Sequence, residues 1–178
     1  MFHCVFATLP DFKTIFTSRF LYSSHHRVGI VWQSWKGDIM ALVKVKRALV
    51  VGCGEFGLAA ADSLSAAGFS VIVVDTDPAA FAGLSARFGG ESVVSDGADV
   101  SVLEECDVAK SSLLVACTER DSVNYFIARV ASEIYGVERV FARIEDEDLI
   151  GMLEDSPIEP ICPHALCLDE FCRLSRIA

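Results

Sequence analysis

Short runs of valine, isoleucine and other apolar residues alternate with amphipathic segments along most of the chain after residue 46. Several runs are almost continuously apolar, which is typical of strands buried on both faces of a parallel sheet. The segments between them carry apolar residues at helical spacing. The predicted strands are residues 47–52, 70–75, 92–96, 112–118 and 139–144, with a short sixth strand near 159–162. The predicted helices are residues 56–68, 77–90, 101–107, 120–136, 145–156 and 165–177.

Helix start and stop signals support this division of the chain. Gly68 and Gly136 end two of the predicted helices, and glycine commonly terminates a helix. Pro78 lies just inside the start of another helix, a position that proline favours. Strands that alternate with helices predict an α/β fold with a doubly wound parallel sheet, Rossmann-like in its order of elements. We therefore expect a single domain over residues 46–163, followed by a C-terminal helix over 164–178.

Residues 1–45 are predicted to form an extension outside this domain. Residues 1–39 contain several aromatic side chains but show no steady helical or strand periodicity. One interpretation is an over-extended start, with translation beginning at Met40, shortly before the first strand. The other interpretation is a genuine basic arm. His25 and His26 lie in this segment, and we interpret them as solvated loop residues.

Charge is distributed unevenly along the chain, and this narrows the range of partners. Residues 1–47 carry a net charge of +5 and the rest of the chain −15, which gives −10 overall. An acidic body repels a polyphosphate backbone, so we expect no nucleic-acid binding by the domain. No apolar run reaches about 18 residues, so no membrane span is expected. The seven cysteines are odd in number and fall within apolar runs, as reduced core cysteines of a cytosolic protein do.

Three glycines with the spacing G-x-G-x-x-G follow the first predicted strand and open the first predicted helix. Gly52 permits a tight turn out of the strand, and Gly54 lets a diphosphate approach the backbone. Gly57 allows the helix to pack close to the sheet. The free N–H groups at the start of the helix then face the phosphates. The alternative is a glycine turn in an α/β domain that binds no nucleotide.

A carboxylate at the end of the second predicted strand favours NAD(H) over NADP(H). Asp75 follows Gly52 by 23 residues, at the position where an acidic side chain can accept hydrogen bonds from both hydroxyls of an adenosine ribose. The same carboxylate would repel a 2′-phosphate.

Further polar residues follow the third and fourth predicted strands. Asp96 is expected where an adenine would lie, with turn capping as the alternative role. Thr118, Asp121 and Asn124 are expected to line the cleft at the carboxyl end of the fourth strand, where α/β sheets bind ligands. Asp121 has an alternative role as the cap of the following helix.

These residues together resemble the TrkA N-terminal domain family, also called RCK or KTN domains, the regulatory nucleotide-binding modules of bacterial and archaeal potassium uptake systems and channels. The resemblance covers about residues 47–163 and includes the stretches "VVGCGEFGLAAADSLSAAGFSVIVVDTDP", "SDGADVSVLEE", "ACTERDSVNYFIARVA" and "RVFARI". It depends on Asp96, on Asp121 and Asn124 in D-x-x-N, and on Arg143 in "ARI". It implies a non-catalytic domain that binds NAD(H) or an adenine nucleotide, assembles as a dimer or ring, and passes ligand state to a membrane partner.

The resemblance also implies that Arg143 faces the nucleotide phosphates, with a surface strand arginine as the alternative. NAD(H) is the first expected ligand, with ATP, ADP and AMP as alternatives, and no catalytic or metal-ligating residue is expected. The predicted nucleotide-binding residues are Gly52, Cys53, Gly54, Glu55, Phe56, Gly57, Asp75, Thr76, Asp77, Asp96, Gly97, Ala98, Thr118, Asp121, Asn124 and Arg143.

Two features depart from the family pattern. Many members have arginine where this chain has Glu55, and a carboxylate beside a diphosphate is electrostatically unfavourable. Affinity and ligand identity therefore stay open. The chain also ends at Ala178, without the family's C-terminal effector-binding domain, which predicts an isolated nucleotide module, completed by another chain.

The tail contains four residues able to bind zinc, Cys162, His164, Cys167 and Cys172. The cysteines recur every five residues, which turns a helix by about 140°, so they do not converge on one face. We expect a packed or interface helix there in place of a metal site. Its apolar residues predict a homodimer or a larger assembly.

The leading functional prediction is a regulatory subunit of a potassium or other cation transporter or channel, held at the cytoplasmic face of the membrane through that partner. The first alternative is an NAD-dependent oxidoreductase, which needs a substrate domain, and fewer than 20 residues follow Cys162. The second is a redox-sensing regulator of transcription, which needs a basic recognition element, and no helix-turn-helix pattern is present.

Overall fold

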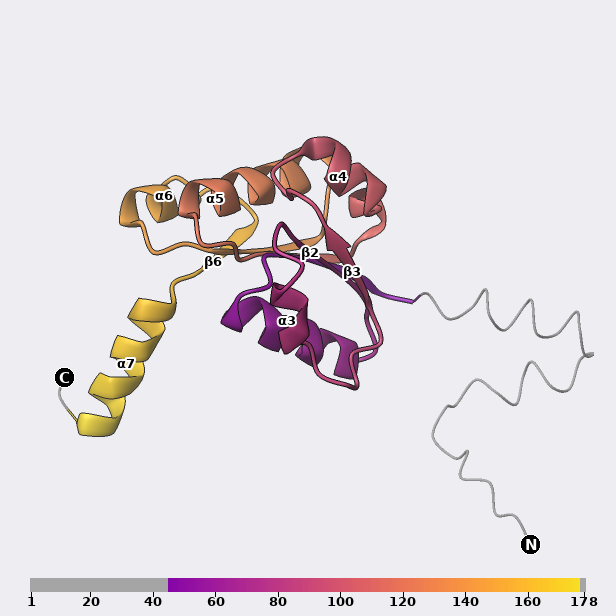
Figure 1. Cartoon of the computed structure of the whole chain (residues 1–178). Coiled ribbons are helices and arrows are strands. Elements are labelled where there is room, and N and C mark those ends of the chain that lie inside the picture. Colours follow the sequence, from indigo (N-terminus) through magenta and orange to yellow (C-terminus); the bar gives the residue numbers. More distant parts are fainter. Residues whose placement is uncertain (1–44, 177–178) are drawn as a thin grey trace, which may run out of the picture. The chain divides into compact units, whose positions relative to one another are not determined.

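The computed structural model describes residues 45–176, in which six parallel strands form one sheet (Figure 1). The strand order is β3-β2-β1-β4-β5-β6, the doubly wound order of a Rossmann-like fold, and the predicted fold class is confirmed. The expectations for Met40, His25 and His26 lie outside the described residues. The strands are β1 (Arg47–Val51), β2 (Ser70–Asp75), β3 (Glu91–Val94), β4 (Leu113–Ala116), β5 (Arg139–Arg143) and β6 (Ile158–Ile161).

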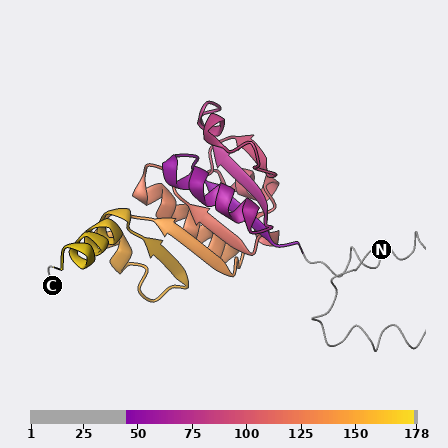
Figure 2. The same cartoon turned by 90° about the horizontal axis from the view of Figure 1, so that it is seen from below.

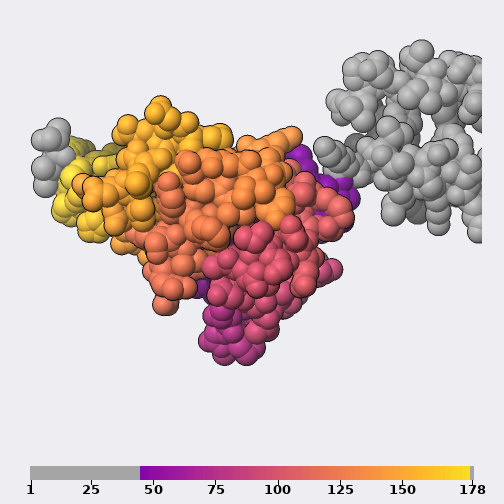
Figure 3. All heavy atoms as spheres, turned by 90° about the horizontal axis from the view of Figure 1, so that it is seen from above, coloured from indigo at the N-terminus to yellow at the C-terminus, as the bar shows by residue number. Residues whose placement is uncertain are grey.

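Helices cover both faces of this sheet. One face carries α3, which lies across the strands in Figure 2, and the other carries α4, α5 and α6, whose atoms cover the face seen in Figure 3. The α-helices are α3 (Glu55–Ala66), α4 (Val100–Glu105), α5 (Asp121–Arg129), α6 (Glu147–Gly151) and α7 (Pro163–Ser175). Shorter helical turns are η1 (Ala80–Gly83), η2 (Val108–Lys110) and η3 (Val130–Ile134), of which η3 is a π-helix.

Each face of the sheet has its own apolar core, which explains the continuous apolar runs in the sequence. In β1, Leu49 and Val51 pack into the core beneath α4 and α5, whereas Ala48 and Val50 pack into the core beneath α3. All four side chains are buried. A strand that is buried on both faces is apolar at successive positions, so its sequence shows no alternation of apolar and polar residues. This agrees with the prediction of a parallel sheet.

The helix predicted over residues 77–90 is wrong, because only η1 forms there. Side chains of α3 hold the segment in an irregular course instead. Asp62 accepts hydrogen bonds from the N–H and hydroxyl of Ser85, and the Ser65 hydroxyl accepts one from the N–H of Gly89. A Cβ on Gly83 would lie 2.4 Å from Leu58 Cδ1, so the segment also packs tightly on α3. Tertiary contacts therefore override local helix propensity.

The remaining predicted elements are present with shifted ends. The helix predicted over 120–136 changes from α5 to the π-helical η3 and ends before Gly136, whose φ is +65°. The helix predicted over 145–156 shortens to α6, and the sixth strand forms as β6.

The predicted C-terminal helix is present as α7, which extends away from the domain beyond β6 (Figures 1 and 2). Its side chains are exposed or half-buried along its whole length, and the large apolar ones that are exposed are Leu166, Leu168, Phe171 and Leu174. Within residues 45–176, no helix is both long enough and apolar enough to cross a bilayer.

Candidate functional site

The candidate site lies at the carboxyl edge of the sheet, where the strand order reverses between β1 and β4. In doubly wound sheets this reversal leaves a crevice outside the strand ends, because the connections on the two sides go to opposite faces. Because the strands are parallel, the loops that follow β1, β2, β4 and β5 all begin at this edge. The predicted site residues on these loops are therefore brought to one side of the domain.

The glycine turn after β1 has the geometry that its spacing predicts. Gly52 has a φ of +104°, and a Cβ there would lie 2.6 Å from the carbonyl of Cys117. A Cβ on Gly57 would lie 2.0 Å from the carbonyl oxygen of Gly52, so α3 could not pack against the turn. A Cβ on Gly54 would meet nothing within 4 Å. The two outer glycines are thus required by packing, and the middle one borders open space.

The start of α3 presents backbone N–H groups toward that open space. Gly54 is the N-cap and provides no side-chain cap, and the N–H of Leu58 is the one that bonds back to its carbonyl. The first N–H groups of a helix have no intrahelical partner and carry partial positive charge. Glu55 and Phe56 are both exposed in this first turn. The arrangement suits an anionic group.

Asp75 lies at the end of β2 with its carboxylate turned toward the glycine turn. Oδ2 accepts a hydrogen bond from the N–H of Cys53 at 2.6 Å, and Oδ1 accepts one from the N–H of Asp77 at 2.9 Å. Each carboxylate oxygen has a second lone pair, so both can still accept from a ligand hydroxyl. Thr76 and Asp77 are exposed beside it, and Asp77 also caps the following turn through the N–H of Ala79.

The loop after β3 uses its polar residue as a turn cap. Asp96 Oδ1 accepts a hydrogen bond from the N–H of Ala98 at 2.9 Å, which is the capping role given above as the alternative. Gly97 is buried, and a Cβ there would lie 2.2 Å from Val51 Cγ1, so its small size lets the loop pack on β1. Asp96 is exposed and its other carboxylate oxygen has no protein partner among the described residues.

Asn124 holds the ends of two strands. Its side chain is fully buried, and Oδ1 accepts from both the N–H and the hydroxyl of Thr118, at 2.8 and 2.7 Å. Nδ2 donates to the carbonyl of Thr118 at 3.0 Å and to that of Arg143 at 2.8 Å. All four hydrogen-bonding positions of the amide are in use, so Asn124 positions the carboxyl ends of β4 and β5.

Asp121 holds the loop that follows β5. Its Oδ2 accepts hydrogen bonds from the N–H groups of Glu145 and Asp146, at 2.8 and 2.9 Å. The N-cap of α5 is Arg120, without a side-chain cap, so the helix-capping interpretation of Asp121 is wrong. Arg143, at the end of β5, pairs with Glu145 at 2.7 Å and approaches the carbonyl of Thr118 at 3.5 Å.

A buried thiol that the sequence interpretation missed lies against the glycine turn. Cys117 directly follows β4, and its Sγ donates a hydrogen bond to the carbonyl of Gly52 at 3.3 Å. Burial raises the pKa of the Cys117 thiol to about 12, which keeps it protonated and poorly nucleophilic at neutral pH. The β1–β4 register, which pairs Val51 with Ala116, is the signal that would have found it. Cys53, also buried, lies in the turn itself.

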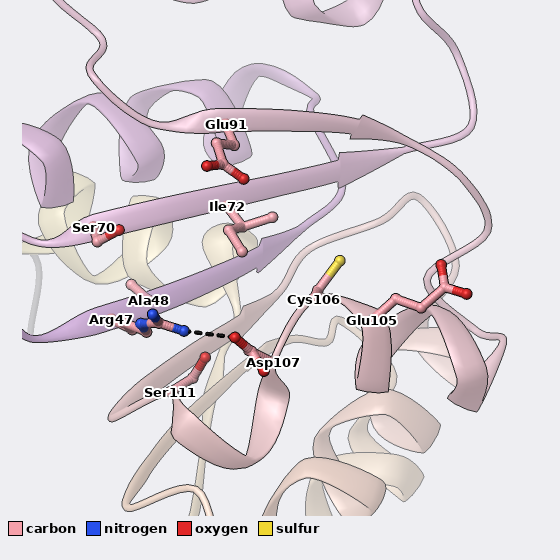
Figure 4. Close-up of a pocket in the computed structure, with 9 residues that line it drawn as sticks. All are labelled: Arg47, Ala48, Ser70, Ile72, Glu91, Glu105, Cys106, Asp107 and Ser111. Atoms are coloured by element: carbon pink, nitrogen blue, oxygen red, sulfur yellow. Dashed lines mark hydrogen bonds and ion pairs between the residues drawn. The ribbon is translucent and has the colours of Figure 1, made fainter.

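A pocket of about 200 Å³ lies at the opposite, amino-terminal edge of the sheet (Figure 4). Arg47 and Asp107 form an ion pair of 2.7 Å in it, and Asp107 also pairs with Lys110. Its lining residues come from the first halves of β1, β2 and β3 and from the segment between the end of α4 and the start of β4, so the pocket is separate from the candidate site.

The four tail residues that are chemically able to bind zinc do not converge, in line with the expectation from their spacing. His164 and Cys167 are exposed, and Cys162 and Cys172 are half-buried near opposite ends of α7. Within the described part of the chain, no group of three or more His, Cys, Asp or Glu side chains could hold a metal ion.

Solved structures share this architecture. The TrkA-N domain of the inner membrane protein ybaL from Escherichia coli superposes with a TM-score of 0.64 at 17% identity, covering 73% of this chain and 96% of that one. The AMP-bound form of a Kef C-terminal domain from Shewanella denitrificans superposes with a TM-score of 0.58 at 18% identity, covering 75% of this chain and 82% of that one. At these identities the likeness shows the fold.

Sequence comparison identifies the family. A Trk system potassium uptake protein TrkA from Streptomyces coelicolor is 40% identical over 98 residues, which are 55% of this chain and 44% of that protein. This chain spans less than half the length of the curated relatives it matches. The model of the TrkA-N domain matches residues 48–162. Since this match covers more than half of the chain, the chain belongs to the TrkA-N domain family.

Proposed function

We propose that this chain is a regulatory module that binds NAD(H) or an adenine nucleotide at the carboxyl edge of its sheet and controls a potassium or other cation transporter or channel. The observation that carries the proposal is the open space beside Gly54. Free N–H groups of α3 border this space, and the Asp75 carboxylate is held on the same turn by the N–H of Cys53. A diphosphate and a ribose need these two kinds of group side by side.

Each part of the site would contact a different part of the ligand. The diphosphate would lie on the residues from Gly52 to Gly57, and the ribose hydroxyls would donate to Asp75. Arg143 would reach the phosphates from the other side of the crevice. Thr76, Asp77, Asp96 and Ala98 would border the adenosine. Asn124 and Asp121 would act by holding strand ends and loop, because the whole amide of Asn124 and one carboxylate oxygen of Asp121 are engaged by the protein.

The acidic character of the edge bears on ligand choice. Asp75 disfavours a 2′-phosphate, which supports NAD(H) over NADP(H). Glu55 lies exposed at the start of α3 and weakens binding of any diphosphate. AMP, as in the bound form of the Kef domain, is an alternative ligand that would place only one phosphate beside Glu55.

The module would act without chemistry. Hydride transfer requires a second group to exchange protons with a substrate beside the nicotinamide. The thiol nearest the turn, Cys117, is buried and stays protonated at neutral pH, which makes it a poor acid or base there.

The partner would be a membrane-embedded subunit of a cation transport system, with this chain bound at its cytoplasmic face. The name of the Streptomyces relative, a potassium uptake protein, supports this. The module would also self-associate through α7, because an isolated 13-residue helix with four exposed large apolar side chains is marginal in water. A dimeric or larger mass by analytical ultracentrifugation supports self-association, and a strict monomer contradicts it.

Calorimetric titration of the full chain with NADH, NAD⁺, ADP and AMP tests the function. We expect saturable binding of at least one of these ligands, weaker binding of NADPH than of NADH, and no oxidation of NADH in the presence of ordinary carbonyl substrates. Steady turnover would contradict the regulatory function, and the absence of binding by all four ligands would contradict the nucleotide site.

A further inference from the structure

We propose that Glu145 is a built-in competitor for the ligand phosphates, occupying Arg143 when the nucleotide is absent and thereby setting the affinity of the site. The proposal rests on the nucleotide-binding function proposed above and assigns a specific role to a residue outside the predicted site.

Arg143 is the cation at the carboxyl end of β5, and it is already engaged. Its Nη2 donates to Glu145 Oε1 at 2.7 Å, and its Nη1 approaches the carbonyl of Thr118 at 3.5 Å. The Arg143 side chain is 29% exposed, so an anion at the edge could reach it. Thr118 also borders the glycine turn, because a Cβ on Gly52 would lie 2.7 Å from its backbone nitrogen, so Arg143 lies near that turn.

The backbone of each partner in this ion pair is anchored by the first turn of α5. Asn124 donates to the carbonyl of Arg143 at 2.8 Å. Asp121, three residues earlier on the same face of the helix, accepts from the N–H of Glu145 at 2.8 Å. Exposed ion pairs are usually weak because two mobile side chains must be ordered. Fixing both backbones keeps the two side chains within reach of each other, so this pair is better placed to persist than a pair on mobile loops.

A ligand phosphate therefore meets a guanidinium whose charge is neutralised. It must displace Glu145 or share the remaining donors beside a carboxylate, and both lower affinity. Replacing Glu145 with glutamine keeps the size and a hydrogen-bond acceptor but removes the charge. The phosphate then competes with a neutral group for Arg143.

The test is calorimetric titration of the full chain with ADP at low salt. We expect Glu145→Gln to bind ADP about three- to tenfold more tightly than the wild type, with a gain that shrinks at high salt. Glu147→Gln is the matched control, because Glu147 is an exposed acid two residues further along, in the first turn of α6. Its affinity should change by less than about twofold.

A second pair of variants isolates the role of Arg143. In an Arg143→Gln background, adding Glu145→Gln should leave ADP affinity unchanged. The guanidinium for which Glu145 and the phosphate compete is then absent. If wild type binds ADP and Glu145→Gln matches Glu147→Gln, the competitor role is overturned while the nucleotide site stands. If neither wild type nor Glu145→Gln binds ADP or NADH, the nucleotide site itself is overturned, and the competitor role with it.

Discussion

The two sides of the candidate site use their polar groups in opposite ways. On the β1–α3–β2 side, packing fixes the glycines, the first N–H groups of α3 have no helix partner, and each Asp75 carboxylate oxygen keeps a second lone pair. On the β4–α5–β5 side, the polar side chains of Asp121 and Asn124 are engaged by backbone groups of neighbouring strands and loops. We propose that the first side meets the ligand, whereas Asp121 and Asn124 on the second side keep the strand ends and the following loop in place.

The largest effect that we expect comes from Gly57, where an added Cβ would come closest to a backbone atom. Gly57→Ala places a Cβ 2.0 Å from the carbonyl oxygen of Gly52, a backbone atom that cannot move without opening the turn. The free energy of unfolding should fall by about 3 kcal/mol or more, measured by chemical denaturation. Gly54→Ala is the control, because its Cβ meets nothing within 4 Å and should cost about 1 kcal/mol or less. Equal losses would mean that the two glycines do not differ as described.

Asn124→Ala should destabilise the fold by about 2–4 kcal/mol, because it removes a fully buried amide and leaves part-buried backbone groups of Thr118 and Arg143 without this partner. Denaturation and calorimetry on the same variant separate its two candidate roles. We expect the loss of stability to be large and the loss of nucleotide affinity to follow from misplaced strand ends. Intact stability together with abolished binding would instead make Asn124 a direct ligand contact.

This contrast also explains which features of the site can be predicted from the sequence and which cannot. The roles of Gly52 and Gly57 can be predicted from the sequence, because a positive φ at Gly52 and a close packing contact at Gly57 each require glycine. Asp121 and Asn124 were placed at the correct edge, but their spacing could not show that they bond to strands whose register was unknown. The segment over 77–90 was misread as a helix because Asp62 and Ser65, which hold it, lie on a different element.

Asp75→Ala should weaken NADH binding by about 1.5–3 kcal/mol through the loss of charge-assisted hydrogen bonds to the ribose, and should reduce the preference over NADPH. Asp155→Ala is the control, since Asp155 is an exposed acid in the turn before β6 and is not among the predicted site residues. Calorimetric affinities that stay equal for both variants would reduce Asp75 to a cap of the glycine turn.

The smallest expected effect concerns Glu55, the exposed acid in the first turn of α3. Glu55→Arg should tighten nucleotide binding roughly tenfold at low salt, because it replaces repulsion of the diphosphate with attraction, and the gain should shrink as salt rises. Titrations at two salt concentrations measure it. Unchanged affinity at low salt would show that Glu55 points away from the bound phosphates.

The most direct test of the nucleotide site is the response of backbone amides to ADP, followed by NMR on the isotopically labelled full chain. We predict that the largest chemical-shift changes fall on the amides of residues 52–57 and on Asp75, with little change at the pocket of Arg47 and Asp107 at the opposite edge. Shifts concentrated at that pocket, or no shifts at all at saturating ADP, would contradict a nucleotide site at the carboxyl edge of the sheet.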